Sequence, residues 1–349
     1  MCTLSTMVMA VTAPSCVPSV PAQSPLPVQQ IPRATSARIE DGEGRLVAIG
    51  ALVRYSTNQA YFILQHLDKV FGDKAVTIYA PDEVSPLNFK IDSVYDSLPD
   101  RTFMPMYIQV HYNSDERLVL EHLIDNLAET TLGRANFELK KNVTIDVFDS
   151  DGDTFLRDNA GFIVADRMQF HQITVDAQQM LRLLTPEPKI NVEEVCDKSV
   201  HQDLLDYDSM LSPHNRSEFL EFLYLKSKVY IARWKLPTNK TAEKENTSKG
   251  TKKKNGGDVA GYLATSRIDN RVLSLYADSD AVAEMLITQY IKESRAKNII
   301  LCTPRDHWSK LQSLGSFKSR VIYRRHTRAI PAHIKWEKIF AMNVGMNLF

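Results

Sequence analysis

His111 is the residue of this chain whose type and position best suit acid–base chemistry. It stands near the end of the stretch 103–112 (FMPMYIQVHY), which alternates as a β-strand does. Imidazole has a pKa near neutrality, so a histidine at the end of a strand that lines a cleft can act as a general base. A single histidine is also common as a structural residue, and both interpretations stay open.

The acidic run Asp-Ser-Asp-Gly-Asp-Thr at 149–154 follows a short apolar strand. Its local pattern resembles phosphatases of the haloacid dehalogenase type, in which one aspartate attacks phosphorus and another moves protons. No later acidic pair with a lysine follows at a strand end, and the glycine position does not fit a calcium loop. We therefore interpret the run as a helix cap and expect no metal site.

A basic cluster stands on or after the last predicted strand, near the end of the chain. An anion could bind there, but we favour a solvated strand edge guarded by charge. The cluster consists of Arg320, Arg324, Arg325, His326 and Arg328.

Length and composition describe an ordinary globular protein with room for two domains. The chain has 349 residues, of which 44% are hydrophobic and 24% charged, and its formal net charge is zero. A general nucleic-acid or membrane-surface binder usually carries a basic excess, so we expect neither nucleic acid nor membrane as a partner. Four scattered cysteines and the absence of a long apolar run predict a reducing compartment, the cytoplasm, with the nucleus as the alternative.

The first half contains alternating strands and helices after a disordered N-terminal segment, residues 1–37. Strands are predicted at 45–54, 75–80, 89–95, 103–112 and 143–148. The apolar residues of NQAYFILQHLDKVFG (58–72) recur at helical spacing, and helices are also predicted at 117–129 and 154–159. We place this domain at 38–192.

The second half repeats part of this order. A helix at 203–226 precedes strands at 228–236, 261–268 and 271–277, a helix at 279–296, a strand at 298–303, a short helix at 307–315 and a closing strand at 319–328. The order strand, long helix, strand, short helix, Gly-Phe or Gly-Ser-Phe, strand occurs near 103–166 and again near 271–328. We predict a second domain at 193–336 with a disordered Lys-rich loop at 237–257, followed by a tail at 337–349.

The segment 273–328, from LSLYADSDAVAEML to SRVIYRRHTR, resembles the C-terminal half of the YitH/HolE-like branch of GNAT-type acyltransferases. LLDYDSMLSPHNRSEFLEFL resembles the helix that opens that half, and the ending RAIPAHIKWEKIFAMNVGMNLF resembles an uncharacterised group expanded in roundworms. The first half is similar to a GNAT core through YIQVHY, VTIDVF and the helices between and after them. The resemblance implies an α/β (α+β) fold of two tandem GNAT-like domains, each a twisted mixed sheet flanked by helices.

The resemblance also implies acetyl-CoA or another acyl-CoA in a cleft, with its pyrophosphate at the N-terminus of the long helix. The family's glycine-containing phosphate loop is missing from both halves. Acids stand there instead, and although they suit a helix cap they repel pyrophosphate. The cofactor-binding candidates are Tyr112, Ser114 and Arg117 in the first half and Tyr276 and Ser279 in the second.

The catalytic residues implied by the resemblance are weakly represented. Many GNAT enzymes protonate the leaving thiolate with a tyrosine four residues before the glycine that closes the short helix. That position is Arg157 in the first half and Leu311 in the second. Arginine is a poor general acid but can neutralise developing negative charge. His111 and Arg157 are therefore the catalytic candidates.

Two functional hypotheses follow. One is a GNAT-type N-acyltransferase-like protein that passes an acyl group from acyl-CoA to an unidentified amine, carried by a small molecule or a protein. The other is a catalytically degenerate GNAT-fold protein, a pseudoenzyme that binds a ligand or partner.

Overall fold

The computed structural model describes residues 30–81, 83–84, 87–96, 116–133, 142–148, 150–196, 201–235, 257–304, 309–312 and 318–343. In the first half the elements are β1 (Ala34–Glu40), β2 (Leu46–Arg54), β3 (Gln59–Leu67), β4 (Ala75–Tyr79), β5 (Asn88–Tyr95), β6 (Arg117–Leu118), α2 (Val119–Leu132), β7 (Asn142–Val147), α3 (Ser150–Asn159), β8 (Val164–Ala165), β9 (Phe170–Asp176) and α4 (Ala177–Leu183). In the second half they are β10 (Ile190–Glu194), α5 (His201–Ser209), α6 (Ser217–Lys226), β11 (Ser227–Trp234), β12 (Val259–Ser266), β13 (Val272–Ala277), α7 (Asp280–Ser294), β14 (Asn298–Pro304), α8 (Ser309–Gln312), β15 (Lys318–His326), a 3-10 turn (Trp336–Lys338) and β16 (Ile339–Ala341).

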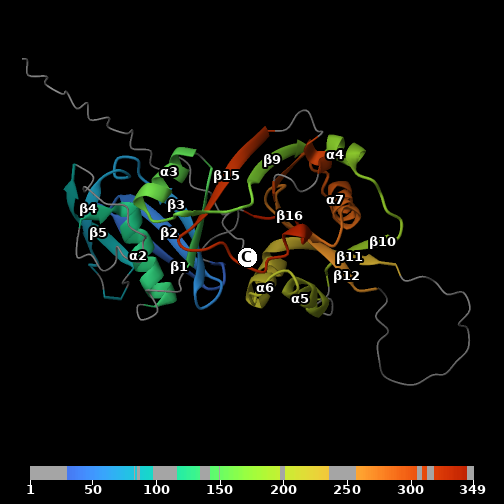
Figure 1. Cartoon of the computed structure of the whole chain (residues 1–349), viewed down its shortest axis with the longest axis horizontal. Helices are drawn as coiled ribbons and strands as arrows, with labels where there is room; N and C mark the ends of the chain where they lie inside the picture. The colour runs from blue at the N-terminus through green and yellow to red at the C-terminus, as the bar shows by residue number, and fades with distance from the viewer. Residues whose placement is uncertain are drawn as a thin grey trace, which may run out of the picture.

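The fold is α/β, as predicted, and is built on two sheets flanked by helices (Figure 1). The larger sheet is mixed, and the strand pairs of the smaller sheet are antiparallel. The larger sheet has the order β14-β9-β15-β7-β3-β2-β1-β5-β4-β6, with β8 also paired to β15. The smaller sheet has the order β10-β11-β12-β13-β16. Among the described residues, no helix is long and apolar enough to cross a membrane.

Each half contains an antiparallel meander followed by a helix and a strand parallel to the meander's last strand. In the first half the meander is β1-β2-β3, and β7 runs parallel to β3. In the second half it is β11-β12-β13, and Arg271, immediately before β13, forms a parallel bridge with Ile300 of β14. The strand predicted at 103–112 lies outside the described residues, and β3 holds the position that corresponds to β13.

The two halves exchange their last strands. β9 of the first half pairs with β14 of the second, and β15 of the second half pairs with both β9 and β7. In Figure 1 the red strand β15 accordingly lies beside elements of the first half. Strands of both halves are therefore combined in the larger sheet.

Three expectations from the sequence were wrong. The stretch 58–72 is largely the strand β3 and not a helix, because its run of apolar residues is buried on both faces, and such a run fits either periodicity. The predicted helix at 203–226 is two helices, α5 and α6, with Pro213 in the segment between them. The boundaries of the terminal segments also differ, since β1 begins at Ala34 and the expected tail contains the buried strand β16.

The basic cluster on β15 is largely buried, contrary to the expected solvated edge. The guanidinium of Arg324 donates two hydrogen bonds of 2.8 Å to the carboxylate of Asp146 on β7, and their side chains are 3% and 0% exposed. Burial lowers the pKa of Arg324, but the charge and hydrogen bonds of Asp146 outweigh burial and raise that pKa above its usual value. Next along the strand, Arg325 pairs with Asp153 of α3. The exchanged strand is thus fixed by ion pairs within the core.

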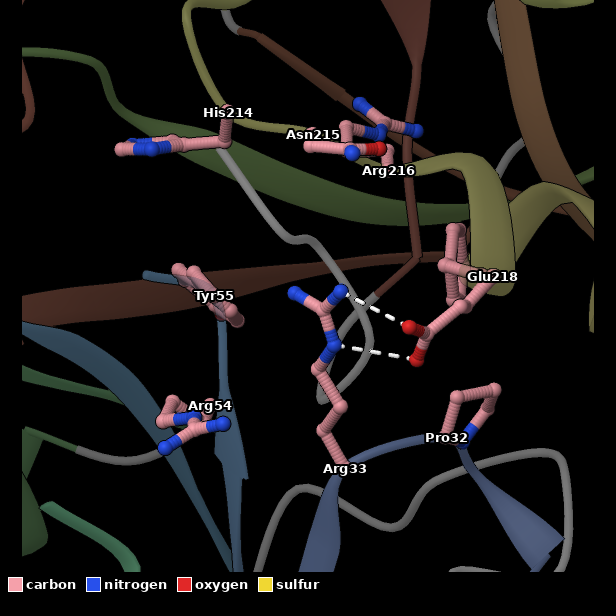
Figure 2. Close-up of a pocket in the computed structure, with 9 residues that line it drawn as sticks. Pro32, Arg33, Arg54, Tyr55, His214, Asn215, Arg216 and Glu218 are labelled. Atoms are coloured by element: carbon pink, nitrogen blue, oxygen red, sulfur yellow. Dashed lines mark hydrogen bonds and ion pairs between the residues drawn. The ribbon is translucent and has the colours of Figure 1, made fainter. Parts of the chain in front are cut away.

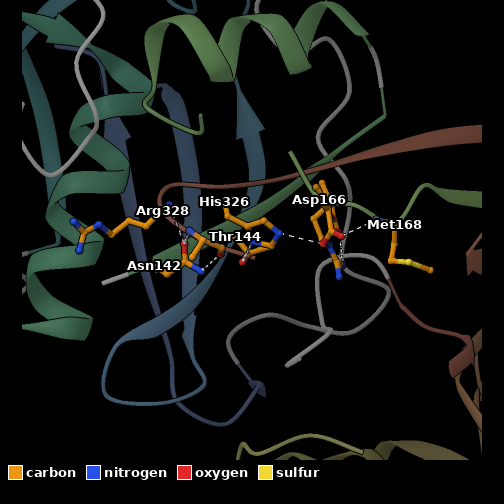
Figure 3. A network of polar contacts seen from close by, with 9 residues as sticks. Asn142, Thr144, Asp166, Met168, His326 and Arg328 are labelled. Atoms are coloured by element: carbon orange, nitrogen blue, oxygen red, sulfur yellow. Dashed lines mark hydrogen bonds and ion pairs between the residues drawn. The ribbon is translucent and has the colours of Figure 1, made fainter. Parts of the chain in front are cut away.

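A second polar network lies on the same strand (Figure 3). One ring nitrogen of His326 lies 2.8 Å from the hydroxyl of Thr144, and the other lies 3.1 Å from a carboxylate oxygen of Asp166. The order Thr-His-Asp is that of a nucleophilic triad, but all three side chains are buried. The network is structural.

Replacing Arg324 by Met should destabilise the protein by about 3–5 kcal/mol, because the carboxylate of Asp146 would be left buried without its cation. Urea unfolding of the full chain measures this loss. The control is Arg157→Ala, which breaks an exposed ion pair and should leave the free energy of unfolding close to that of the wild type. A loss below about 1 kcal/mol for Arg324→Met would show that β15 is held by other contacts.

The decrease in the free energy of unfolding at acidic pH should depend on Asp166. Burial raises the pKa of its carboxyl, but the bond with His326 and the charge of Arg324 outweigh burial and hold the pKa below its usual value. The stabilisation is therefore fully present above the unfolded pKa and disappears as the pH falls through the lower, folded pKa. In urea unfolding across roughly pH 2 to 5, Asp166→Asn should show a shallower loss of stability than the wild type. Equal slopes would contradict this assignment.

Candidate functional site

Of the first-half candidates, the structure describes Arg117 and Arg157, whereas His111, Tyr112 and Ser114 lie outside the described residues. Arg117 is in β6 at the start of α2, and Arg157 is in the last turn of α3. β7 is the strand that leads into α3. In the sheet, five strands lie between β6 and β7, namely β4, β5, β1, β2 and β3. The two arginines therefore belong to opposite ends of the first-half sheet.

Arg117 lines a pocket of about 500 Å³ between β4, β5 and the first turns of α2. Its guanidinium pairs with the carboxylate of Asp125, a largely buried side chain of α2. The imidazole of His122 contacts the carbonyl oxygen of Val76 at 2.7 Å. The wall is mostly polar, and its other members are Thr77, Ile78, Tyr79, Ala80, Phe89, Asp92, Ser93, Tyr95 and Asn126. The volume is within the range of small-molecule sites, and the arginine is the one cation among these lining residues.

The start of α2 carries its own carboxylate. Glu121 accepts a hydrogen bond of 2.8 Å from the backbone N–H of Leu118, and its side chain is buried. This interaction stabilises the helix through its dipole and competes with any anionic ligand at the same backbone group.

Arg157 is exposed and forms an ion pair with its neighbour Asp158. The hydrogen bond to Asp158 raises the pKa of Arg157 above its usual value. A guanidinium in this state does not release a proton, so the residue can neutralise charge but cannot act as a general acid.

In the second half, Tyr276 and Ser279 lie on either side of the turn between β13 and α7. The ring of Tyr276 is fully buried, packs edge-to-face against Tyr262 at 5.0 Å, and lies 5.5 Å from the guanidinium carbon of Arg216. Ser279 is the N-cap residue of α7, and its hydroxyl makes no hydrogen bond within the described part of the chain. Tyr276 is therefore a core residue, and of the two only Ser279 borders the helix start.

The turn is closed by contacts to Asp278. One carboxylate oxygen accepts a hydrogen bond of 3.1 Å from the hydroxyl of Tyr207 and lies 2.9 Å from the ammonium of Lys338. The sequence predicted this acid as an obstacle to pyrophosphate, but it did not reveal the lysine, which belongs to the expected tail.

Strand β16 follows Lys338 directly and lies between β13 and β14. Its residues pair with β13, and Met342 forms an antiparallel bridge with Cys302 of β14. Ile339, Phe340 and Met342 are 0%, 1% and 2% exposed. Full burial of such side chains contributes about 1.5–3 kcal/mol each, so this strand is a substantial part of the core.

A buried charged cluster lies beneath the segment that joins α5 and α6. Arg216 and Asp208 form an ion pair at 3.3 Å, and Asp208 also accepts a hydrogen bond of 2.6 Å from Tyr262. Burial lowers the pKa of Arg216, but the charge of Asp208 together with Tyr276 and Tyr262 outweighs burial and raises that pKa above its usual value. These residues border a groove of about 380 Å³ between the two helices. Sequence reasoning missed the pair, because the immediate neighbours of Arg216 are Asn215 and Ser217 and those of Asp208 are Tyr207 and Ser209, which give no sign of burial.

The three acids of α5, at 203, 206 and 208, contact different partners. Asp203 pairs with Arg233, and Asp206 accepts a hydrogen bond from Gln202. Within the residues that the structure describes, no group of three or more His, Cys, Asp or Glu side chains could hold a metal ion.

A small cavity lies where the N-terminal residues of the first half meet α6 (Figure 2). Arg33 donates hydrogen bonds of 3.0 and 2.9 Å to the carboxylate of Glu218, and Arg54 and Tyr55 lie on the first-half side. His214 and Arg216 line the second-half side, so the same segment borders this cavity and the α5–α6 groove.

Comparison with known families gives one match. Residues 18–164 match a family described as a domain of unknown function, DUF7596. The match covers less than half of the chain, and its description names no activity. No curated protein is similar to the chain at a significant level.

Solved structures with a related arrangement include several acetyltransferases. A candidate acetyltransferase from Pyrococcus horikoshii is 13% identical, with 86% of this chain and 76% of that chain covered and a TM-score of 0.49. A GCN5-related N-acetyltransferase from Sphaerobacter thermophilus is 9% identical, with coverages of 84% and 81% and a TM-score of 0.45. A GCN5-related N-acetyltransferase from Kribbella flavida is 11% identical, with coverages of 80% and 57% and a TM-score of 0.38. Likeness at this level does not identify an activity, and the strand order given above defines the fold.

Replacing Tyr262 by Phe should cost about 1.5–3 kcal/mol of stability, because the charged Asp208 would lose a buried hydrogen bond. The measurement is urea unfolding. The matched control is Tyr79→Phe, whose ring is 48% exposed and whose change should be within about 0.5 kcal/mol. If both variants unfold alike, the hydroxyl of Tyr262 contributes nothing to the buried ion pair.

Proposed function

We propose that the protein acts as a GNAT-type N-acyltransferase and binds its acyl-CoA in the first half, at the pocket beside Arg117. The observation that carries this proposal is the position of Arg117, at the beginning of a 14-residue helix and on the wall of a pocket of about 500 Å³. A guanidinium next to a helix N-terminus is a favourable place for a phosphate group. Asp125 supports the role because it fixes the direction of the guanidinium.

In the proposed reaction the acceptor amine attacks the carbonyl carbon of the thioester. The carbon–sulfur bond breaks, the amine loses a proton, and the CoA thiol and an N-acylated product leave. His111 is proposed as the base that takes the amine proton. Arg157 is left out of this mechanism, because it belongs to the opposite end of the first-half sheet from Arg117. The acceptor is an amine on a small molecule or a protein. Because the cysteines are scattered, we place the reaction in the cytoplasm or the nucleus.

A second candidate is a binding protein of the same fold that transfers no acyl group. Its support is the carboxylate of Glu121 at the start of α2, which opposes a pyrophosphate there. The two candidates differ in the fate of the thioester. An acyltransferase releases free CoA thiol from acetyl-CoA in the presence of an accepted amine, whereas a binding protein releases none.

Arg117→Ala should weaken CoA binding about 10- to 100-fold, which corresponds to the loss of one charge-assisted contact to phosphate. Calorimetric titration of the full chain with CoA, together with the ligand-induced rise in melting temperature, measures this effect. The matched control is Arg38→Ala, which removes an arginine on β1 that does not line this pocket. Equal affinities for Arg117→Ala and wild type would remove the pocket from consideration. No binding at millimolar CoA would exclude the acyltransferase altogether.

A further inference from the structure

β13 and β14 leave a gap between them that a third strand fills. They run parallel and meet in the bridge between Arg271 and Ile300, near their beginnings. Farther along, Leu275 and Tyr276 of β13 face Ala341 and Ile339, and the backbone N–H of Met342 donates a hydrogen bond of 2.9 Å to the carbonyl oxygen of Cys302. β16 is antiparallel to both neighbours and supplies backbone partners to each.

The equivalent place in the first half has no inserted strand. β3 and β7 pair directly from Gln59 with Asn142 to Phe62 with Ile145. The two halves are therefore not equivalent at the position where their parallel strands separate, although their meanders, helices and strand directions correspond.

The inserted strand belongs to the cores on both faces of the sheet. Ile339 and Met342 pack in the hydrophobic cluster that contains residues of α5 and α6. Phe340 and Ala341 pack in the cluster that contains residues of α7. Withdrawal of β16 would open both clusters at once, which distinguishes it from a lid that rests on a surface.

The charged residues beside the gap, next to the start of α7, favour a strand that stays in place. Lys338 pairs with Asp278 immediately before α7 and also lies 5.7 Å from the ring of Tyr207. The preceding turn is anchored by Trp336, whose ring lies 5.6 Å from that of Phe170 on β9. The lysine and acid neutralise each other where a pyrophosphate would need an uncompensated cation.

We infer that the gap between β13 and β14 is a strand-binding groove occupied permanently by residues 338–342 of the same chain, and that the second half takes no acyl-CoA. This inference rests on the proposed function for its meaning, since it limits the protein to a single donor site in the first half. It also gives the segment 338–342 a role as a built-in occupant of the groove.

The test is a disulfide that locks β16 in place. Leu275→Cys and Ala341→Cys stand directly opposite each other in the β13–β16 register. The matched control pair is Val229→Cys and Ala264→Cys, also buried and directly opposite, between β11 and β12. CoA stoichiometry and affinity are measured by calorimetry for wild type and for both double variants, oxidised and reduced.

We expect the lock to form completely, wild type to bind at most one CoA per chain, and oxidation to change the affinity by less than about twofold, within the ordinary scatter of such measurements. Two sites in wild type, or a site lost on oxidation of the first pair but not of the control pair, would overturn the inference. A folded variant that does not form the disulfide would also overturn it. Zero sites would refute the proposed function while leaving the closed groove supported.

Should the cysteine variant not fold, hydrogen exchange of the wild type decides the question. The backbone amides of residues 339–342 should be protected as strongly as those of β12, and saturating CoA should leave their exchange rates unchanged. Faster exchange at these amides on addition of CoA would mean that the strand leaves to admit the ligand, and the inference would then be wrong.

Discussion

The ion pair between Arg324 and Asp146 is the contact on which the joining of the two halves depends. One partner comes from β15, the last long strand of the chain, and the other from β7 of the first half. Burying two charges costs desolvation free energy, which is offset only when they pair with each other. The buried guanidinium and carboxylate meet that condition because they form two parallel hydrogen bonds. The pair discriminates strongly against a shifted register, because moving β15 by one residue would turn the arginine to the other face of the sheet.

Strand exchange also explains why the two halves differ although their elements correspond. β7 has β3 and β15 as neighbours, whereas β14 has β9 on one side and reaches β13 largely through β16. The chain therefore uses the same meander, helix and parallel strand twice but closes the two copies differently. The first half keeps a pocket at the start of its long helix, and in the second half the corresponding turn is covered by Asp278, Lys338 and the buried strand.

Local sequence patterns predicted the elements whose stability is local. The amphipathic helix at 117–129 and the helix at 279–296 are α2 and α7, and the apolar strands at 143–148 and 298–303 are β7 and β14, within a few residues. The stretch 58–72 was wrongly predicted as a helix. Both faces of β3 are buried, which removes the alternation of apolar and polar residues that identifies a strand. β16 has three residues, and its partners are far along the chain, so no periodicity could indicate it. For the site, the sequence singled out Arg117, which lines the pocket beside α2, and its role there stays a prediction. The buried pair of Asp208 and Arg216 depends on tertiary contacts that spacing does not encode.

The exchanged strand has a consequence for synthesis on the ribosome. When β7 emerges, the edge that it will share with β15 has no partner, because residues 318–326 have not yet been made. At the usual speed of translation, the wait is roughly ten to forty seconds. During that time the nascent chain carries an unpaired strand edge with the carboxylate of Asp146 on it, and a charge at an exposed edge discourages pairing with other chains. The same carboxylate that later anchors the sheet can thus protect the unfinished protein from aggregation.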